Sequence, residues 1–206
     1  VLEKLRIITK SPVEKSGPEM NVWYWEYPVE GNNYVASADV SRGDSGDYST
    51  FHIINVKTMS VAVEFKGKIP PDNFASLLYD IARRFNKALI CPENNAYGYT
   101  VLSKLGDLGY DNIYFPSERE KYKFLYGEEN NIGKAGFNTN KESREKILAN
   151  FEESLRNGRI KTKSTRLVSE LKTFVWNGKK VGAMKGYNDD LIMSLAIGCW
   201  ISDSNS

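Results

Sequence analysis

The amino-acid sequence predicts an α/β domain in which a mixed β-sheet is flanked by helices. Two observations lead to this fold class. Strand patterns rich in aromatic and β-branched residues fill the first third of the chain, and strand and helix patterns alternate after residue 70. The 206 residues, 41% of them hydrophobic and 26% charged, are enough to bury one sizeable core.

The first third of the chain contains four strand patterns. An aromatic run at 21–28 ends at a Pro/Gly turn, and a nearly continuous apolar run follows at 34–40. Two more apolar stretches, at 49–56 and 60–67, are separated by a short polar turn. Strands joined by such short turns pair antiparallel, so this part of the chain predicts an antiparallel meander.

Helical spacing begins after two prolines, where apolar residues recur over 71–85. The apolar run at 87–93 returns as a strand, and because a helix connects it to the meander we expect it to lie parallel in the sheet. A short strand is expected at 112–115, and a hairpin is expected at 175–184. Further helices are expected at 99–108, 141–157, 167–174 and 189–202.

Residue types exclude several classes of protein. Cys91 and Cys199 lie inside apolar stretches, which is typical of buried thiols in a reducing compartment rather than of a disulfide framework or zinc site. The one histidine, His52, lies in a strand pattern, so a Ser-His-Asp or zinc mechanism has little to build on. The longest apolar run, 191–201, is shorter than the roughly 20 residues of a membrane span. We therefore expect a cytoplasmic protein with no membrane partner.

Acidic residues stand at the ends of two predicted strands and at the start of the last helix. Asp39 and Glu93 follow strands whose carboxyl ends should meet at one edge of the sheet, where α/β proteins place their functional crevice. Asp189 and Asp190 open the most apolar run of the chain, where a helix N-terminus favours an ionised carboxylate. Adjacent helix positions point about 100° apart, so we expect Asp189 to face the crevice and Asp190 the surface.

Clustered carboxylates raise one another's pKa unless a divalent cation neutralises them, and all-oxygen ligation suits Mg²⁺ or Mn²⁺. Two such ions about 3.5–4 Å apart stabilise the attacking and leaving oxygens of a phosphodiester displacement. This chemistry needs no histidine. Taken singly, an aspartate at a turn or a glutamate at a strand end needs no functional explanation, but acids from three separate elements predict a shared one.

Three motifs carry a resemblance to a known family: "ADVSRGDSGDYS" around Asp39, "CPENN" around Glu93 and "NDDLIMSLAIG" at the last helix. Together with their surroundings at 25–56, 88–110 and 158–198, they resemble the C-terminal nuclease domain of large terminase subunits of tailed bacteriophages. The resemblance implies an RNase H-like fold and an endonuclease that cuts concatemeric phage DNA during genome packaging with two divalent metal ions. It implies catalytic roles for Asp39, Glu93 and Asp189, and metal ligation by these three with Asp190 and Asp47.

The sequence departs from the family pattern in two places. Asn188 stands where many members have histidine, and 127–135 has neither the glycine spacing nor the hydroxyl residue of a P-loop. The resemblance therefore implies an isolated nuclease domain at 21–206 that binds no nucleotide, with 1–20 as the remnant of a linker. In a full-length protein it implies an N-terminal ATPase domain, with the portal and small terminase subunit as partners. The expected location is the host cytoplasm during virion assembly, and not the mature virion.

Positive charge is concentrated near the C-terminal end of the chain, although the net charge is only +2. Between residues 156 and 185, Glu170 is the only acid among nine lysines and arginines. Such an excess predicts a surface that binds the phosphates of double-stranded DNA. We call this set the basic stripe, and its expected DNA contacts are Arg159, Lys161, Lys163, Arg166, Lys179, Lys180 and Lys185. The polar segment 117–136 is expected to be a loop over the site.

Alternatives to a terminase nuclease remain at this point. A junction resolvase or transposase would share the RNase H-like fold, and a catalytically inactive DNA-binding or docking module would also explain the basic stripe. The turn after Asp39 loosely resembles the first phosphate loop of actin-like and sugar-kinase-like ATPases, but no second Gly-rich loop follows Glu93. A dependence of DNA cleavage on Mn²⁺ would separate these classes.

Overall fold

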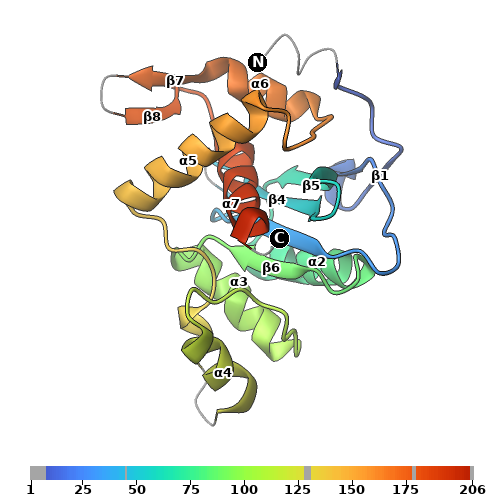
Figure 1. Cartoon of the computed structure of the whole chain (residues 1–206), viewed down its shortest axis with the longest axis vertical. Helices are drawn as coiled ribbons and strands as arrows, with labels where there is room; N and C mark the ends of the chain where they lie inside the picture. Colours follow the sequence, from blue (N-terminus) through green and yellow to red (C-terminus); the bar gives the residue numbers. More distant parts are fainter. Residues whose placement is uncertain (1–7, 45, 128–130, 178–179, 205–206) are drawn as a thin grey trace.

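The computed structural model describes residues 8–44, 46–127, 131–177 and 180–204 (Figure 1). A six-stranded sheet of order β1-β2-β5-β4-β3-β6 lies at its centre. All neighbouring strands are antiparallel except β3 and β6, which are parallel. The strands are β1 Glu14–Ser16, β2 Val22–Tyr24, β3 Tyr34–Asp39, β4 Ser49–Asn55, β5 Ser60–Gly67 and β6 Leu89–Pro92.

The structure confirms the antiparallel meander for β3, β4 and β5, and it confirms that β6 is parallel to β3. The expectation that the 21–28 strand continues this meander next to β3 is wrong, because β2 pairs with β5. The reason is that β6 occupies the other side of β3, whereas β5 has an open edge. Part of the expected linker also belongs to the domain, since β1 pairs with β2 and supplies partners for its backbone groups.

Helices α2 (Pro71–Arg84) and α3 (Ala96–Asp107) cover one face of the sheet, below it in the view of Figure 1. Helix α3 begins directly after β6 because the Asn95 side chain accepts hydrogen bonds from the amides of Tyr97 and Gly98. This cap places the start of α3 beside the end of β6, where Glu93 lies.

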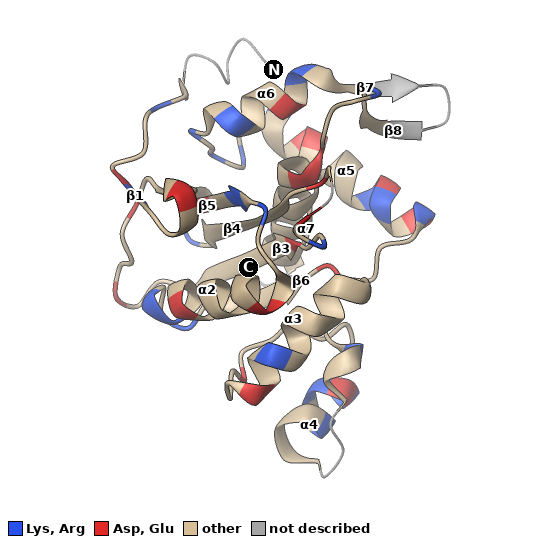
Figure 2. Ribbon diagram, turned by 180° about the vertical axis from the view of Figure 1, so that it is seen from behind, with Lys and Arg blue, Asp and Glu red and all other residues tan. Residues whose placement is uncertain are grey.

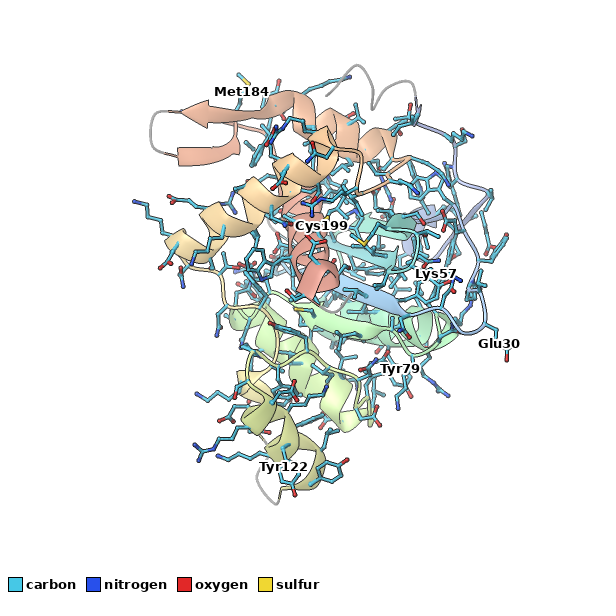
Figure 3. The ribbon with its side chains drawn as sticks, viewed as in Figure 1. Glu30, Lys57, Tyr79, Tyr122, Met184 and Cys199 are labelled. Carbon is cyan, nitrogen blue, oxygen red and sulfur yellow. The ribbon has the colours of Figure 1, made fainter. Side chains whose placement is uncertain are left out.

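Helices α5 (Lys141–Arg156), α6 (Thr165–Thr173) and α7 (Asp190–Ser204) cover the opposite face. Helix α7 is buried around nearly its whole circumference, between the sheet and the outer helices α5 and α6, which explains why its sequence is apolar without a polar face. Gly198 permits this close contact, since a Cβ there would lie 2.4 Å from Ser37 Oγ. Cys199 lies inside this layer as a free, buried thiol, as expected (Figure 3).

Three smaller elements differ from the sequence-based expectations. The segment expected to be a loop contains the helix α4 (Glu118–Tyr126) and a short 3-10 turn, Ile132–Lys134, and Phe124 anchors α4 by packing against Phe115. Helix α4 projects away from the body of the domain, with Tyr122 exposed (Figure 3). Residues 112–115 form one parallel bridge with β6 rather than a strand. The expected hairpin is present as β7 (Phe174–Asn177) and β8 (Lys180–Ala183).

No helix in the described part of the chain is long and apolar enough to cross a membrane.

Candidate metal centre

Asp39 and Glu93 lie side by side at the carboxyl ends of the two parallel strands. The register of β3 and β6 pairs Ala38 with Pro92, and the amide of Glu93 donates a hydrogen bond of 2.8 Å to the carbonyl of Ala38. Burial raises the pKa of Asp39 well above its usual value, and the nearby carboxylates of Glu93, Asp190 and Asp189 raise it further. The structure therefore brings the three predicted acidic positions to one edge of the sheet.

The aspartates at the head of α7 point in different directions. Asp190 is only 8% exposed, and its Oδ2 accepts a hydrogen bond of 3.1 Å from the amide of Tyr48. Burial raises the pKa of Asp190, against the lowering effect of the Tyr48 amide. Asp189 turns instead toward α5, where its Oδ2 lies 2.7 Å from Nη2 of Arg144. The expectation that Asp190 faces the surface is wrong, because the loop before β4 covers it.

A cleft of about 560 Å³ opens at this edge. Asp39, Asp189 and Asp190 line it together with Asp47 from the loop after β3. Asn188 donates a hydrogen bond of 3.4 Å to Asp47 Oδ1, so this loop is held against the start of α7. Further lining residues are Val40, Ser41, Arg42, Asp44, Asn95 and Tyr97.

Glu93 borders the cleft through Asn95 rather than lining it. The Nδ2 of Asn95 donates to Glu93 Oε2 at 3.2 Å and to the carbonyl of Val40 at 3.3 Å. One amide thus caps α3, orients the Glu93 carboxylate and ties it to the chain that follows Asp39. Asn95 was not among the predicted site residues, although its place after a predicted ligand and before a predicted helix was a signal for it.

The donor set fits a hard divalent cation, because it consists of carboxylate oxygens gathered at one cleft, and burial together with the neighbouring carboxylates raises the pKa values of Asp39 and Asp190. Within the described residues, no group of three His, Cys, Asp or Glu side chains is arranged as a ready ligand set. Asp189 is paired with Arg144 in this arrangement, and the Tyr48 amide holds Asp190 at the cleft.

Glu170 fixes the start of α7 and was not predicted to do so. Its Oε2 accepts hydrogen bonds from the amides of Leu191 at 2.9 Å and Ile192 at 3.2 Å, and its Oε1 pairs with Lys66 at 2.5 Å. Burial raises the pKa of Glu170 to about 7, against the lowering effect of Lys66. In the sequence Glu170 is distinguished only as an acid among basic residues, and nothing there indicates that the amides it bonds lie at the head of another helix.

A second polar network runs through the core behind the cleft. His52 Nδ1 lies 2.9 Å from Ser194 Oγ, and Ser194 bonds Thr50, which donates to the carbonyl of Asp190 at 2.8 Å. The other ring nitrogen, Nε2, lies 3.3 Å from the buried carboxylate of Glu64. His52 therefore has the structural role expected of it, and it ties the sheet to the first turns of α7.

The residues of the basic stripe have different environments in the folded protein, and some of them are buried or paired with acids. Arg166 is largely buried, with Nε 2.8 Å from Glu64 Oε1 and its guanidinium stacked 3.8 Å from the Trp23 ring. Burial alone would raise the pKa of Glu64, but hydrogen bonds and charge from His52, Arg166 and Ser164 lower it. Arg166 is thus the partner of a buried carboxylate, and its side chain is engaged inside the domain.

Other members of the basic stripe differ in whether they are paired with an acid or exposed to solvent. Lys163 lies 3.3 Å from Glu26, and Arg159 lies 3.6 Å from Asp203, so both are paired with acids. Lys161 and Lys185 are exposed. Lys179 and the side chain of Lys180 lie outside the described residues. Figure 2 shows lysines and arginines spread over several elements with acids among them, rather than as one continuous band.

No protein-family model matches the sequence. The structure is similar to that of the large terminase nuclease from thermophilic phage G20c with bound magnesium, with a TM-score of 0.72 at 15% identity over 97% of this chain and 95% of that one. The fold is that of a large terminase nuclease domain. The Thermus phage P74-26 large terminase nuclease domain gives a TM-score of 0.67 at 15% identity, over 96% and 92% of the two chains. The expected RNase H-like mixed sheet flanked by helices is therefore confirmed.

Divalent metals accompany this fold in several of the similar structures. The G20c large terminase nuclease is also known with bound cobalt, at a TM-score of 0.71 to this chain, and with bound zinc, at 0.66. The corresponding structures cover 97% and 96% of this chain at 15% and 16% identity.

Proposed function

We propose that this chain is a metal-dependent DNA endonuclease of the terminase type, which cuts concatemeric phage DNA during genome packaging by two-metal-ion phosphodiester hydrolysis. The observation that carries the proposal is the convergence of Asp39, Glu93 and the Asp189–Asp190 pair at the carboxyl ends of β3 and β6. The similarity of the fold to phage nucleases with bound magnesium and cobalt supports it.

In this proposal the chain's own residues hold and orient two Mg²⁺ or Mn²⁺ ions. Asp39 is the central ligand, with Glu93 on one side and the aspartates of α7 on the other, and Asp47 is an additional ligand from the loop. Bound ions would supply charge neutralisation and an activated water for in-line displacement at phosphorus. Asn188 carries no titratable group, so no proton transfer passes through that position.

Four residues hold the ligands in place before an ion binds. Asn95 orients Glu93, the Tyr48 amide orients Asp190, and Asn188 holds the loop that bears Asp47. The hydrogen bonds to Glu170 fix the helix that presents both aspartates. Such support from neighbouring residues is typical of metal sites, where it sets the orientation of the ligands.

The proposed substrate is double-stranded DNA, and the exposed Lys161 and Lys185 are proposed phosphate contacts. In a full-length protein we propose an N-terminal ATPase domain, with the portal and the small terminase subunit as partners. Action would take place in the host cytoplasm during virion assembly, and no nucleotide would bind to this domain.

Cleavage of plasmid DNA tests the proposal. The protein should nick or linearise the plasmid with Mg²⁺ or Mn²⁺, and chelation by EDTA should abolish cleavage, whereas ATP should have no effect. Asp39→Asn should abolish cleavage, and Asp80→Asn, an exposed aspartate on α2, is the matched control that should cleave normally. Hydrolysis of ATP without DNA cleavage, or cleavage that persists in EDTA, would contradict the proposal.

Thermal stability separates a ligand from a structural carboxylate. Asp39→Asn should leave the metal-free melting temperature unchanged or higher, because it removes repulsion from an acidic cluster. An ion that binds only the folded state stabilises it by RT ln(1 + [L]/Kd), so millimolar Mn²⁺ should raise the melting temperature of wild type much more than that of the variant. If Asp39→Asn unfolds the domain and metal stabilises neither protein, Asp39 is structural.

A further inference from the structure

Arg144 on α5 contacts Asp189, one of the residues that line the cleft. Its Nη2 lies 2.7 Å from Asp189 Oδ2, and its Nη1 lies 2.7 Å from Met193 Sδ on the next turn of α7. Gly182 of β8 stands beside this pair, since a Cβ there would lie 3.8 Å from Asp189 Oδ2 and 3.9 Å from Arg144 Nη2. The Arg144 guanidinium therefore forms an ion pair with the carboxylate of a proposed metal ligand, at a point where α5, α7 and the hairpin meet.

The ion pair is not needed to hold these elements together. Helix α5 is anchored by buried apolar residues, among them Ile147 and Phe151. The start of α7 is fixed independently through Glu170 and through the main chain of Asp190. The side chains of Arg144 and Asp189 are 31% and 26% exposed, and pairs with such access to water contribute little to folding.

We propose that Arg144 competes with the metal ion for Asp189 and so lowers the metal affinity of the centre. This inference rests on the proposed function. The guanidinium satisfies the Asp189 carboxylate in the metal-free protein and holds it toward α5. A divalent ion that recruits Asp189 must break this pair and must also bind near the positive charge of Arg144. Both effects oppose binding of the ion. With Arg144 present, a higher metal concentration is therefore needed before Asp189 ligates the ion than the carboxylates would need without Arg144.

The test measures metal binding to the intact chain without DNA. Arg144→Gln removes the charge and keeps a shorter polar side chain, and Mn²⁺ and Mg²⁺ affinities are determined by isothermal titration calorimetry. We expect Arg144→Gln to bind Mn²⁺ about five- to tenfold more tightly than wild type, from the loss of one partly exposed ion pair and its repulsion of the metal. The metal-induced rise in melting temperature should increase accordingly.

Arg156→Gln is the matched control. It makes the same charge change on the same helix, but Arg156 pairs with Glu152 on the exposed surface of α5. Its Mn²⁺ affinity should equal that of wild type. A second comparison uses Asp189→Asn, in which the contested carboxylate is absent. Adding Arg144→Gln to that variant should tighten binding much less than in wild type, because only the repulsion of the ion by Arg144 is then removed, whereas a general effect of charge alone would tighten binding equally in both backgrounds.

The outcomes separate this inference from the proposed function. If wild type binds neither ion, the proposed function fails. If wild type binds metal but Arg144→Gln binds it equally or more weakly, the competition is overturned and the metal centre stands. Should Arg144→Gln fold poorly, Arg144→Met removes the charge and keeps an unbranched side chain that can pack beside α7. An unchanged affinity in that variant overturns the competition as well.

Discussion

Replacing Gly98 by alanine tests whether the start of α3 positions Glu93. Gly98 lies in the first turn of α3, directly against the main chain of the proposed ligand. A Cβ at this position would lie 1.8 Å from the carbonyl oxygen of Glu93 and 3.0 Å from its carbonyl carbon. Because real Cβ contacts stay beyond 3.0 Å, the helix or the Glu93 backbone must move by at least about 1.2 Å. No flexible side chain is available to absorb this displacement.

The expected change in stability combines two opposing effects. Alanine gains about 1 kcal/mol over glycine in a helix interior, whereas overpacking of a tight contact costs about 1–3 kcal/mol and more when backbone must move. We therefore expect Gly98→Ala to lower the free energy of unfolding by about 1–2 kcal/mol. Cleavage should suffer more than stability, because a 1 Å misplacement of a reacting group costs about 100-fold in rate.

The control lies on the same helix. A Cβ at Gly106 would meet only Ile132 Cγ1 at 3.9 Å, an ordinary contact, so Gly106→Ala should stabilise the protein or leave it unchanged. Urea unfolding followed by circular dichroism gives the stabilities, and plasmid cleavage in Mn²⁺ gives the activities. If Gly98→Ala is as stable as Gly106→Ala and cleaves at the wild-type rate, the close approach of α3 does not position Glu93.

Three further predictions concern charge. The pKa of Glu170 is raised from 4.5 to about 7, so protonated Glu170 contributes about 3 kcal/mol to the free energy of unfolding below pH 4.5, and this contribution is lost as the pH rises through 7. Glu170→Gln should therefore flatten the pH dependence of urea unfolding. An unchanged pH profile would count against a raised pKa of Glu170. Arg166→Met should cost about 3–5 kcal/mol because it leaves the Glu64 carboxylate buried without its cation, and an unaltered melting temperature would contradict this role. Replacing Lys161 and Lys185 by glutamine should lower the slope of log affinity against log salt by about 0.9 per lost phosphate contact, with metal affinity unchanged; a constant slope would place the DNA elsewhere.

The elements that depend on local pattern were predictable from the sequence. Helices α2, α5 and α7 and strands β3 to β6 follow from apolar spacing, caps and turns. The pairing of β2 with β5 was not predictable, because it depends on which sheet edge remains open after β6 has joined β3. Helix α4 was missed for another reason: Phe124, which packs against Phe115, gives it an apolar anchor, but most of its sequence is polar.

The candidate site likewise combines residues that a local pattern predicts with contacts that form only in the folded protein. Asp39 and Glu93 were found because each ends a strand, which is a local property. The groups that hold or oppose the ligands come from distant parts of the chain: Arg144 reaches Asp189 across 45 positions, and Glu170 reaches Leu191 across 21. A sequence alone shows the residue types but not these pairings, because the helices must first pack before the side chains meet.

Helix α7 contributes both to the candidate site and to the core. Its first residues border the cleft, and the rest of the helix lies at the centre of the protein interior. An interior helix enclosed on all sides cannot shift or fray without disturbing the packing of the entire domain. Its main-chain amides should therefore exchange with solvent only when the whole domain opens. Any adjustment of the acidic centre during a catalytic cycle must accordingly come from side-chain rotation and from the loop residues 40–44 and 46–47, while the helix itself keeps its position.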